Sequence, residues 1–158
     1  MVSGYIGCLL HIKREKNMRV KVVKMYDDVR LPEYATEGSG CFDIYNYELI
    51  KSSGNTKTYS TGLKFEIPDG YVMLVYSRSG HGFKHNIRLA NCVGVIDSDY
   101  RGELIVKLTE DGIEFIHAEE NAAIAQGMII PIPKVAFTVV DELSSTVRGE
   151  GGFGSTNK

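Results

Sequence analysis

The chain has 158 residues, of which 43% are hydrophobic and 24% charged, with a formal net charge of -2 at pH 7. These values are ordinary for one soluble domain with a single core. A charge so close to zero gives no reason to expect nucleic acid or a membrane as a partner, and we predict neither. Three cysteines without zinc-site spacing, Cys8, Cys41 and Cys92, favour reduced thiols and a cytoplasmic location, or the host cytoplasm for a viral protein.

Residues 1–17 are interpreted as an N-terminal extension, because the alternating pattern begins only after them. The hydrophobic period is close to two from there on, as in β-strands. In chain order, strands are predicted at residues 19–25, 61–67, 71–76, 87–96, 104–108, 113–117 and 136–140. Residues 45–60 are polar and are predicted to form a loop, and one short helix is predicted at 79–84. With seventeen glycines, this pattern indicates an all-β sandwich or barrel related to the jelly roll.

Residues 94–103 are the strongest candidate for a catalytic segment, because an apolar run ends there in two carboxylates and a tyrosine. Asp97 and Asp99 stand at the point where a buried strand would meet solvent. A carboxylate in such a place can be partly desolvated and act as a general base. Clusters of this kind are also common in simple hairpin turns, so this segment alone leaves both interpretations open.

The C-terminal segment is rich in glycine and has no apolar period, which predicts an arm or a disordered tail. Arg148 and Phe153 are unexpected in a tail without a function. An arginine can bind phosphate bidentately, and a phenylalanine among glycines can cover a flat ring. The segment also approaches the P-loop pattern, but it lacks the lysine and a following helix.

Five segments in this order resemble motifs of the trimeric dUTP diphosphatase (dUTPase) family. They are residues 35–44, 77–80, 94–103, 122–127 and 148–156, and the resemblance extends from Met18 to the C-terminus. The resemblance implies a jelly-roll-like distorted β-barrel at 18–143, with one short helix, and a mobile glycine-rich arm at 144–158. It also implies a homotrimer that hydrolyses dUTP to dUMP and pyrophosphate. Such an enzyme limits uracil incorporation into DNA and supplies dUMP for thymidylate synthesis.

The same resemblance implies a role for each motif residue. Asp97 would be the general base for a water that attacks the α-phosphorus of dUTP, and Asp99 would be structural. Tyr100 would pack against the deoxyribose and leave no room for a 2′-hydroxyl. The uracil would be read by the backbone of a hairpin that includes Asn91, Gly94, Val95 and Ile96.

Phosphate binding would come from the turn formed by Arg78, Ser79 and Gly80, together with the amide of Gln126. Asp43 would orient, through water, a Mg²⁺ ion held by the triphosphate. Mg²⁺ keeps several waters and takes other ligands from substrate phosphates, so no protein cage is expected.

The arm would close over the site of a neighbouring subunit once substrate is bound. Arg148 would reach the terminal phosphate, and Phe153 would cover the uracil. Ser155 and Thr156 would add phosphate contacts, and Gly154 would also bind the substrate.

Two positions depart from the family pattern. Ser77 stands where proline is usual, which predicts a less rigid phosphate turn. Ala123 stands where an arginine is usual, which affects local stability or the inner contacts of the trimer more than the chemistry. His81 and His85 are interpreted as packing or surface residues.

Two other functions remain open from the sequence. A dCTP deaminase relative would share the fold, but it needs a different acidic residue in motifs that we do not find here. A regulatory or protein-binding module of the same fold is the second alternative, with its partner surface on the N-terminal extension or on residues 45–60.

Overall fold

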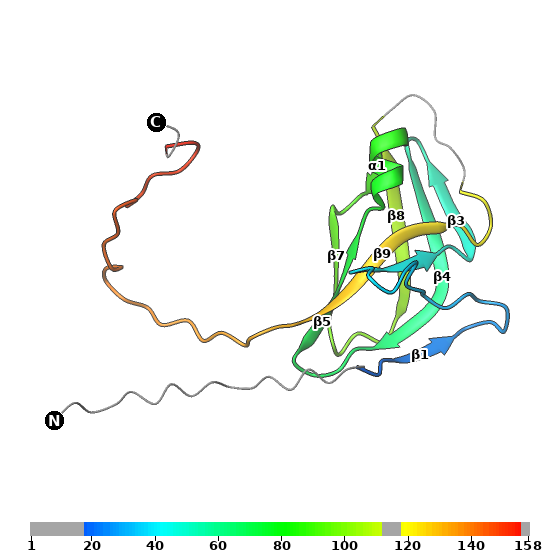
Figure 1. Ribbon diagram of the computed structural model, residues 1–158, viewed down its shortest axis with the longest axis horizontal. Coiled ribbons are helices and arrows are strands. Elements are labelled where there is room, and N and C mark those ends of the chain that lie inside the picture. The colour runs from blue at the N-terminus through cyan, green and yellow to red at the C-terminus, as the bar shows by residue number, and fades with distance from the viewer. Residues whose placement is uncertain (1–17, 112–117, 156–158) are drawn as a thin grey trace.

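The computed structural model describes residues 18–111 and 118–155, and in them two antiparallel sheets enclose one core (Figure 1). The first sheet has the order β1 (Lys21–Lys24), β4 (Thr56–Glu66), β8 (Glu103–Glu110) and β6 (Ile87–Leu89), with β3 (Glu48–Ser53) also paired to β4. The second has the order β2 (Phe42–Tyr45), β9 (Ala123–Pro131), β5 (Tyr71–Tyr76) and β7 (Val93–Ile96). The helix α1 (Ser79–His85) follows β5. The predicted all-β, jelly-roll-like fold with one short helix is confirmed.

The core forms because alternate side chains of both sheets point inward. The largest fully buried side chains come from strands of both sheets: Ile44, Tyr59, Leu63, Met73, Val106 and Ile124. Their burial removes enough apolar surface from water to hold the two sheets together.

Several predicted elements are confirmed, and others are wrong. The strand at 71–76 has the predicted bounds, and α1 extends the predicted helix by one residue. The predicted strand 87–96 is instead two strands in different sheets, because Cys92 takes a left-handed φ of 63° and turns the chain between them. The predicted loop 45–60 is largely the β3–β4 hairpin. Neither β2 nor β9 was expected, and residues 1–17 and 113–117 lie outside the described residues.

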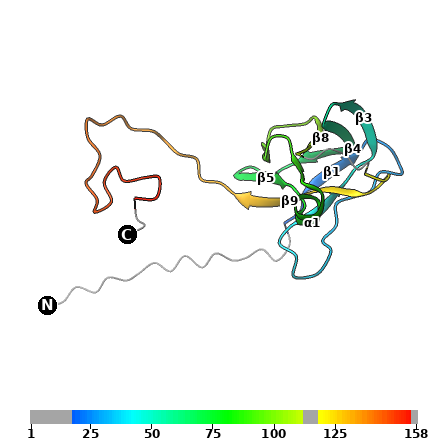
Figure 2. The same cartoon turned by 90° about the horizontal axis from the view of Figure 1, so that it is seen from above.

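The predicted strand at 136–140 is wrong for a single chain. After Pro131 the chain leaves the sheets and runs away from the body of the molecule (Figures 1 and 2). Phe137 is 94% exposed and Val139 98% exposed, so the apolar alternation of this segment buries nothing within its own chain. A strand requires a partner edge for its backbone groups, and this segment has none among the described residues.

Within residues 18–111 and 118–155, no helix is long and apolar enough to cross a membrane.

Candidate active site

Three strands of the second sheet meet at one corner of the molecule. Asp43 on β2 is the cross-strand partner of Gln126 on β9, and Gln126 is the partner of Tyr76 on β5. Directly opposed residues lie about 5 Å apart. The predicted metal-orienting aspartate, the predicted phosphate-binding glutamine and the phosphate turn after Tyr76 therefore share this corner, which we call the phosphate corner.

Arg78 connects the elements of the phosphate corner. Its Nε donates to Oδ1 of Asp43 at 3.2 Å, and its Nη1 donates to the carbonyl of Ala123 at 3.0 Å. The Arg78 and Asp43 side chains are only 34% and 20% exposed, so this ion pair is partly shielded from solvent. These bonds hold the guanidinium at the corner from one side.

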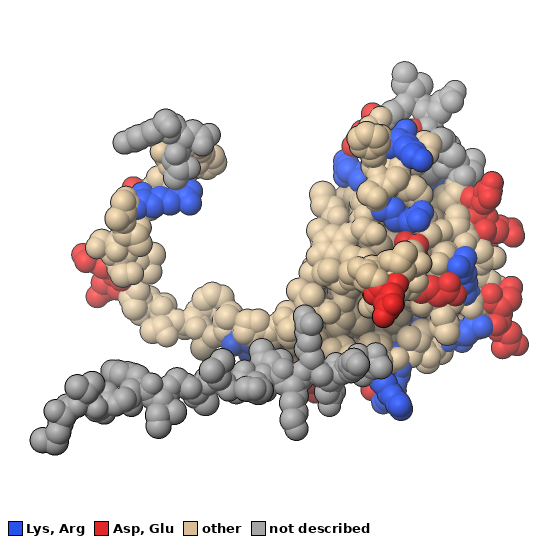
Figure 3. Space-filling model, in the orientation of Figure 1, with Lys and Arg blue, Asp and Glu red and all other residues tan. Residues whose placement is uncertain are grey.

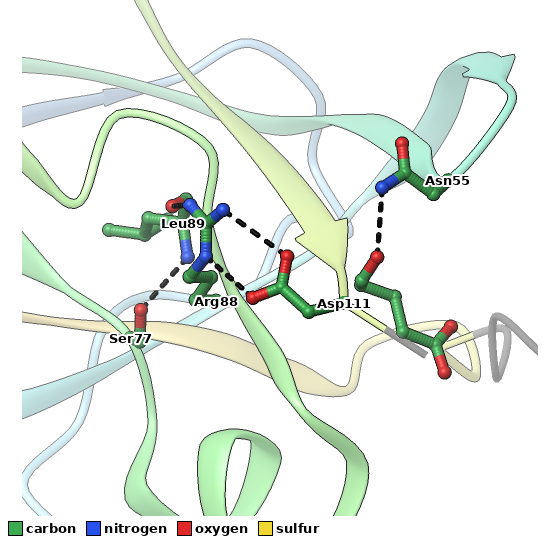
Figure 4. A network of polar contacts seen from close by, with 6 residues as sticks. Asn55, Ser77, Arg88, Leu89 and Asp111 are labelled. Carbon is green, nitrogen blue, oxygen red and sulfur yellow. Dashed lines mark hydrogen bonds and ion pairs between the residues drawn. The ribbon is translucent and has the colours of Figure 1, made fainter. Parts of the chain in front are cut away.

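The two polar groups of residue 77 tie the phosphate turn to its neighbours. The amide of Gln126 donates to the Ser77 carbonyl at 3.2 Å. The Ser77 hydroxyl accepts from the backbone N–H of Leu89 at 2.8 Å, and Figure 4 shows the two groups facing each other. A proline has no hydroxyl and could not accept this second bond. The bond to Leu89 therefore restores some of the rigidity that the phosphate turn loses when serine replaces the usual proline.

Ser79 and Gly80 begin α1 and are exposed, and His81 follows them in the first turn. The Nδ1 atom of His81 is buried and has no hydrogen-bond partner among the described residues. Burial lowers the pKa of His81, and the positive charges of Arg78 and His85 lower it further. His81 is therefore held in its neutral form beside the phosphate turn.

The residues predicted to read the base and the sugar line two adjoining cavities along β7. Asn91, Gly94, Val95 and Ile96 line a cavity of about 270 Å³. Gly94 is needed there for a reason that the sequence did not show: a Cβ would lie 3.1 Å from Cβ of Val75 on the neighbouring strand β5.

The second cavity, of about 200 Å³, is lined by Ile96, Asp97 and Tyr100, among others. The backbone N–H of Tyr100 donates to the carbonyl of Asp97 at 3.2 Å, which closes the turn between them. Both Asp97 and Asp99 are exposed in the single chain. The partial burial expected of Asp97 is therefore wrong for the chain alone.

The two halves of the predicted site lie at opposite ends of β5. Ile96, the residue before Asp97, pairs with Met73, and Arg78 lies five residues beyond Met73 along the chain. Because the strands are antiparallel, Asp97 lies one residue further from Arg78 than Ile96 does, and at about 3.3 Å per residue six residues separate the two by roughly 20 Å. One chain does not bring the predicted base and the predicted phosphate turn into contact.

The described part of the arm, as far as Ser155, reaches neither half of the site. Nε of Arg148 donates to the carbonyl of Gly151 at 2.7 Å, which folds the arm locally, and Phe153 is fully exposed. Gly154 and Ser155 are also exposed, and Thr156 lies outside the described residues. In Figure 3 the arm stands clear of the body of the molecule.

The described residues contain no group of three or more acidic, histidine or cysteine side chains that could hold a metal ion. Asp43 is the carboxylate of the phosphate corner, and one of its oxygens is engaged by Arg78. This donor set is insufficient for a metal site made of protein alone. It fits an ion whose other ligands are water and substrate phosphates.

Some contributors to the site carried no signal in the sequence. The Ala123 carbonyl acts through its main chain, which any residue supplies. The Ser77 hydroxyl could have been found from its departure from the family pattern, but its partner Leu89 could not.

Comparison with known proteins now places the chain in a family. A family model described as dUTPase matches residues 27–157. A deoxyuridine 5′-triphosphate nucleotidohydrolase of Nautilia profundicola is 42% identical over 142 residues, which are 89% of this chain and 100% of that protein. The protein belongs to the dUTPase family.

Solved structures agree on the fold. A variant of the dUTPase of Staphylococcus bacteriophage 80alpha, solved with dUpNHpp, has a TM-score of 0.76 and 25% identity, covering 89% of this chain and 99% of that one. A variant of the dUTPase of the S. aureus phage phi11, described with a structural Mg(II) ion, has a TM-score of 0.69 and 23% identity, covering 81% and 100%.

Proposed function

We propose that this protein is a dUTP diphosphatase, which hydrolyses dUTP to dUMP and pyrophosphate. The observation that carries the proposal is the division of the site into a phosphate corner and a pair of cavities that end at Asp97. The match of the family model to residues 27–157 supports the same activity. Removal of dUTP limits uracil in DNA, and dUMP is the precursor of thymidylate.

The base would be selected in the cavity beside β7. Main-chain donors and acceptors of residues 91–96 present a fixed pattern of hydrogen bonds, and a base with the wrong pattern leaves buried polar groups unpaired. Such mismatches discriminate more strongly than a difference in size. The close packing of Gly94 on Val75 supports a wall too rigid to adapt to the C5 methyl of thymine.

Phosphate recognition would combine one guanidinium with main-chain amides. Arg78 keeps its second terminal nitrogen, Nη2, out of the bonds to Asp43 and Ala123. The first amides of α1 have no partner within the helix and are directed out of its first turn. A guanidinium and several N–H groups bind a polyphosphate better than one charge does. Gln126 would contribute mainly by holding the turn through Ser77.

For catalysis, Asp97 would take a proton from the water that attacks the α-phosphorus. The carboxylate is exposed in the free chain and engages no cation among the described residues, so it can accept this proton. Closure of the arm would shield it from bulk water, which strengthens its interaction with the attacking water. When bound with the triphosphate, Mg²⁺ would neutralise phosphate charge, and Asp43 would hold it through water.

A homotrimer would unite the two halves of the site. Arg78 and Asp97 lie roughly 20 Å apart along the sheet, and the described part of the arm reaches neither. Each active site would therefore take its phosphate corner from one subunit, its base from a second and its arm from a third. The free thiols Cys41 and Cys92 support a reducing compartment, the cytoplasm.

A groove on the body of the molecule supports this assembly. A cavity of about 850 Å³ lies between β1 and β2, which are edge strands of the two sheets, and its apolar lining includes Val20, Val22, Phe42, Phe65 and Ile129. Residues 135–140 carry an exposed, alternating apolar pattern with no partner strand among the described residues. This segment of a second subunit would add as a strand at that edge and bury its side chains in the groove.

Pyrophosphate release from dUTP, dCTP, dTTP and UTP, with Mg²⁺ present, tests the activity together with base and sugar selection. We expect that dUTP is the only one of the four nucleotides to be hydrolysed. Ammonia release from dCTP would instead indicate a deaminase, and an intact dUTP pool would refute the proposal.

Mixed trimers test the shared site. Asp97→Asn subunits and Arg78→Ala subunits, each inactive alone, are unfolded together and refolded as a mixture. If the two residues come from different subunits, random mixing restores about a quarter of the sites. If both residues served one site within one chain, the mixture would remain inactive.

A further inference from the structure

The ring of Tyr100 is held in a defined position before any substrate arrives. Its hydroxyl donates to the backbone carbonyl of Glu103 at 3.0 Å. Its backbone N–H is bound to the carbonyl of Asp97. The side chain therefore folds back along its own turn and forms part of the wall of the 200 Å³ cavity that it shares with Asp97.

The acceptor of the Tyr100 hydroxyl is itself fixed to the first sheet. The carboxylate of Glu103 accepts from the backbone N–H of Gly62 at 2.8 Å and from the hydroxyl of Ser60. Both partners lie where β4 has an irregular register against β8, between Ser60 and Lys64. The Tyr100 hydroxyl is therefore bonded to a residue, Glu103, that cannot move independently of the first sheet.

The ring lies directly over Gly102. A Cβ atom at Gly102 would stand 2.5 Å from Cζ and 2.9 Å from Cε2 of Tyr100, and closer still to its hydroxyl oxygen. The three nearest atoms all belong to this one side chain. Gly102 does not have a positive φ, so its backbone conformation is open to other residues. What requires a glycine here is the tyrosine ring.

We propose that Gly102 determines sugar specificity: by leaving room for the folded ring, it keeps Tyr100 against the place of the sugar C2′ atom and excludes ribonucleotides. The inference rests on the proposed function, in which Tyr100 packs against deoxyribose. Gly102 acts through Tyr100 and touches no substrate, so it is a positioning residue.

The physical consequence of a side chain at 102 follows from the surroundings of the ring. Cβ–ring distances below 3 Å are not tolerated, and the backbone is held by Glu103. The ring is already 46% exposed, so the available movement is rotation toward solvent. That rotation breaks the bond to Glu103 and opens the cavity wall where a 2′-hydroxyl would stand.

The test compares kcat/KM for dUTP and UTP in the full-length Gly102→Ala enzyme. Steric rejection of an added hydroxyl is on the order of 100-fold, and we expect the dUTP/UTP ratio to fall about tenfold. Gly82→Ala is the matched control, because a Cβ there would lie 3.9 Å from its nearest neighbour, the carbonyl oxygen of Ile87, and its ratio should equal that of the unmodified enzyme. An unchanged ratio in folded Gly102→Ala overturns the inference.

A double-mutant cycle separates specificity from general damage. On a Tyr100→Ala background, Gly102→Ala should no longer change the ratio, because the ring through which it acts is gone. An equal effect on both backgrounds would overturn the inference.

Tyr100→Phe covers the case in which Gly102→Ala does not fold. It keeps the ring and removes the tether, and loss of one hydrogen bond should lower the ratio about fivefold. An unchanged ratio in this variant would then refute the tethered-ring argument. Failure of the unmodified enzyme to hydrolyse dUTP is a separate result, and it refutes the proposed function instead.

Discussion

The phosphate corner and the cavities along β7 are built on the same strand, β5, by different means. At the corner, Arg78, Asp43 and Gln126 are side chains from separate segments, and each is bonded to another segment. Along β7 the walls are mainly main chain and apolar side chains; Asp97 is exposed, and the Glu103 carboxylate is bonded to Ser60 and Gly62 of β4. In the proposed function, phosphate recognition would use side chains already held by bonds in the free chain, whereas base recognition would depend on the shape of the backbone.

The largest loss of activity is expected from substitution of an exposed carboxylate beside β7. Asp97→Asn should lower kcat for pyrophosphate release by about 1,000-fold, because the amide cannot accept the proton of the attacking water. Asp99→Asn is the matched control in the same turn and should leave kcat within about threefold, since an exposed turn residue adds little to the reaction. The reverse order of effects would assign the base to Asp99.

A smaller loss is expected when the arm can no longer cover the site. Phe153→Ala should lower kcat/KM for dUTP about tenfold, because stacking on the base is worth roughly 1 kcal/mol or more. Its melting temperature should not change, because the side chain is fully exposed. Val147→Ala, another fully exposed arm position, serves as the control, and an equal loss there would show that the effect is not specific to the ring.

The phosphate corner should respond mainly in stability. Ser77→Ala leaves the Leu89 N–H without its acceptor, which should cost about 1–2 kcal/mol in the free energy of unfolding. Ser77→Thr keeps the hydroxyl and should recover most of that loss. Denaturant titration measures both, and identical stabilities for the Ala and Thr variants would contradict the role given to this bond.

The smallest effect is a pH dependence of stability from His81. Its pKa in the folded protein is lowered by burial first and by Arg78 and His85 next, so below the unfolded-state pKa the unfolded chain binds more protons than the folded one. His81 therefore makes stability fall as the pH falls from 7 toward 5. In His81→Gln that slope should be shallower, as measured by denaturant midpoints across this range. A steeper slope would contradict the assignment.

The sequence was sufficient for the fold class, for the strand at 71–76 and for the helix after it, because each shows a local pattern bounded by turn residues. It was insufficient where non-local contacts decide. β3 is exposed at every position and has no apolar face, so only its pairing to β4 makes it a strand. Residues 136–140 have the apolar alternation of a strand, but the part of the chain that the structure describes offers them no partner edge.

The site shows the same limit. The residue types that the family motifs share could be read from the sequence, and so could the placement of Arg78 just before a helix. The roles of the Ala123 carbonyl and of the space at Gly102 could not, because they arise from distances between segments that meet only in the folded chain. Nor does a motif indicate whether two residues of an active site come from the same subunit or from different subunits.

The exit of the arm from β9 has one more consequence. Pro131 and Pro133 bracket the point where the chain leaves the sheet, and each fixes its own φ near −65°. Head-to-tail exchange of arms closes into a ring when the rotation from each subunit to the next returns to the first subunit, and it grows into an open fibre when it does not. In the proposed homotrimer, these two rigid residues would set the angle at which the arm leaves, and with it the closure of the ring.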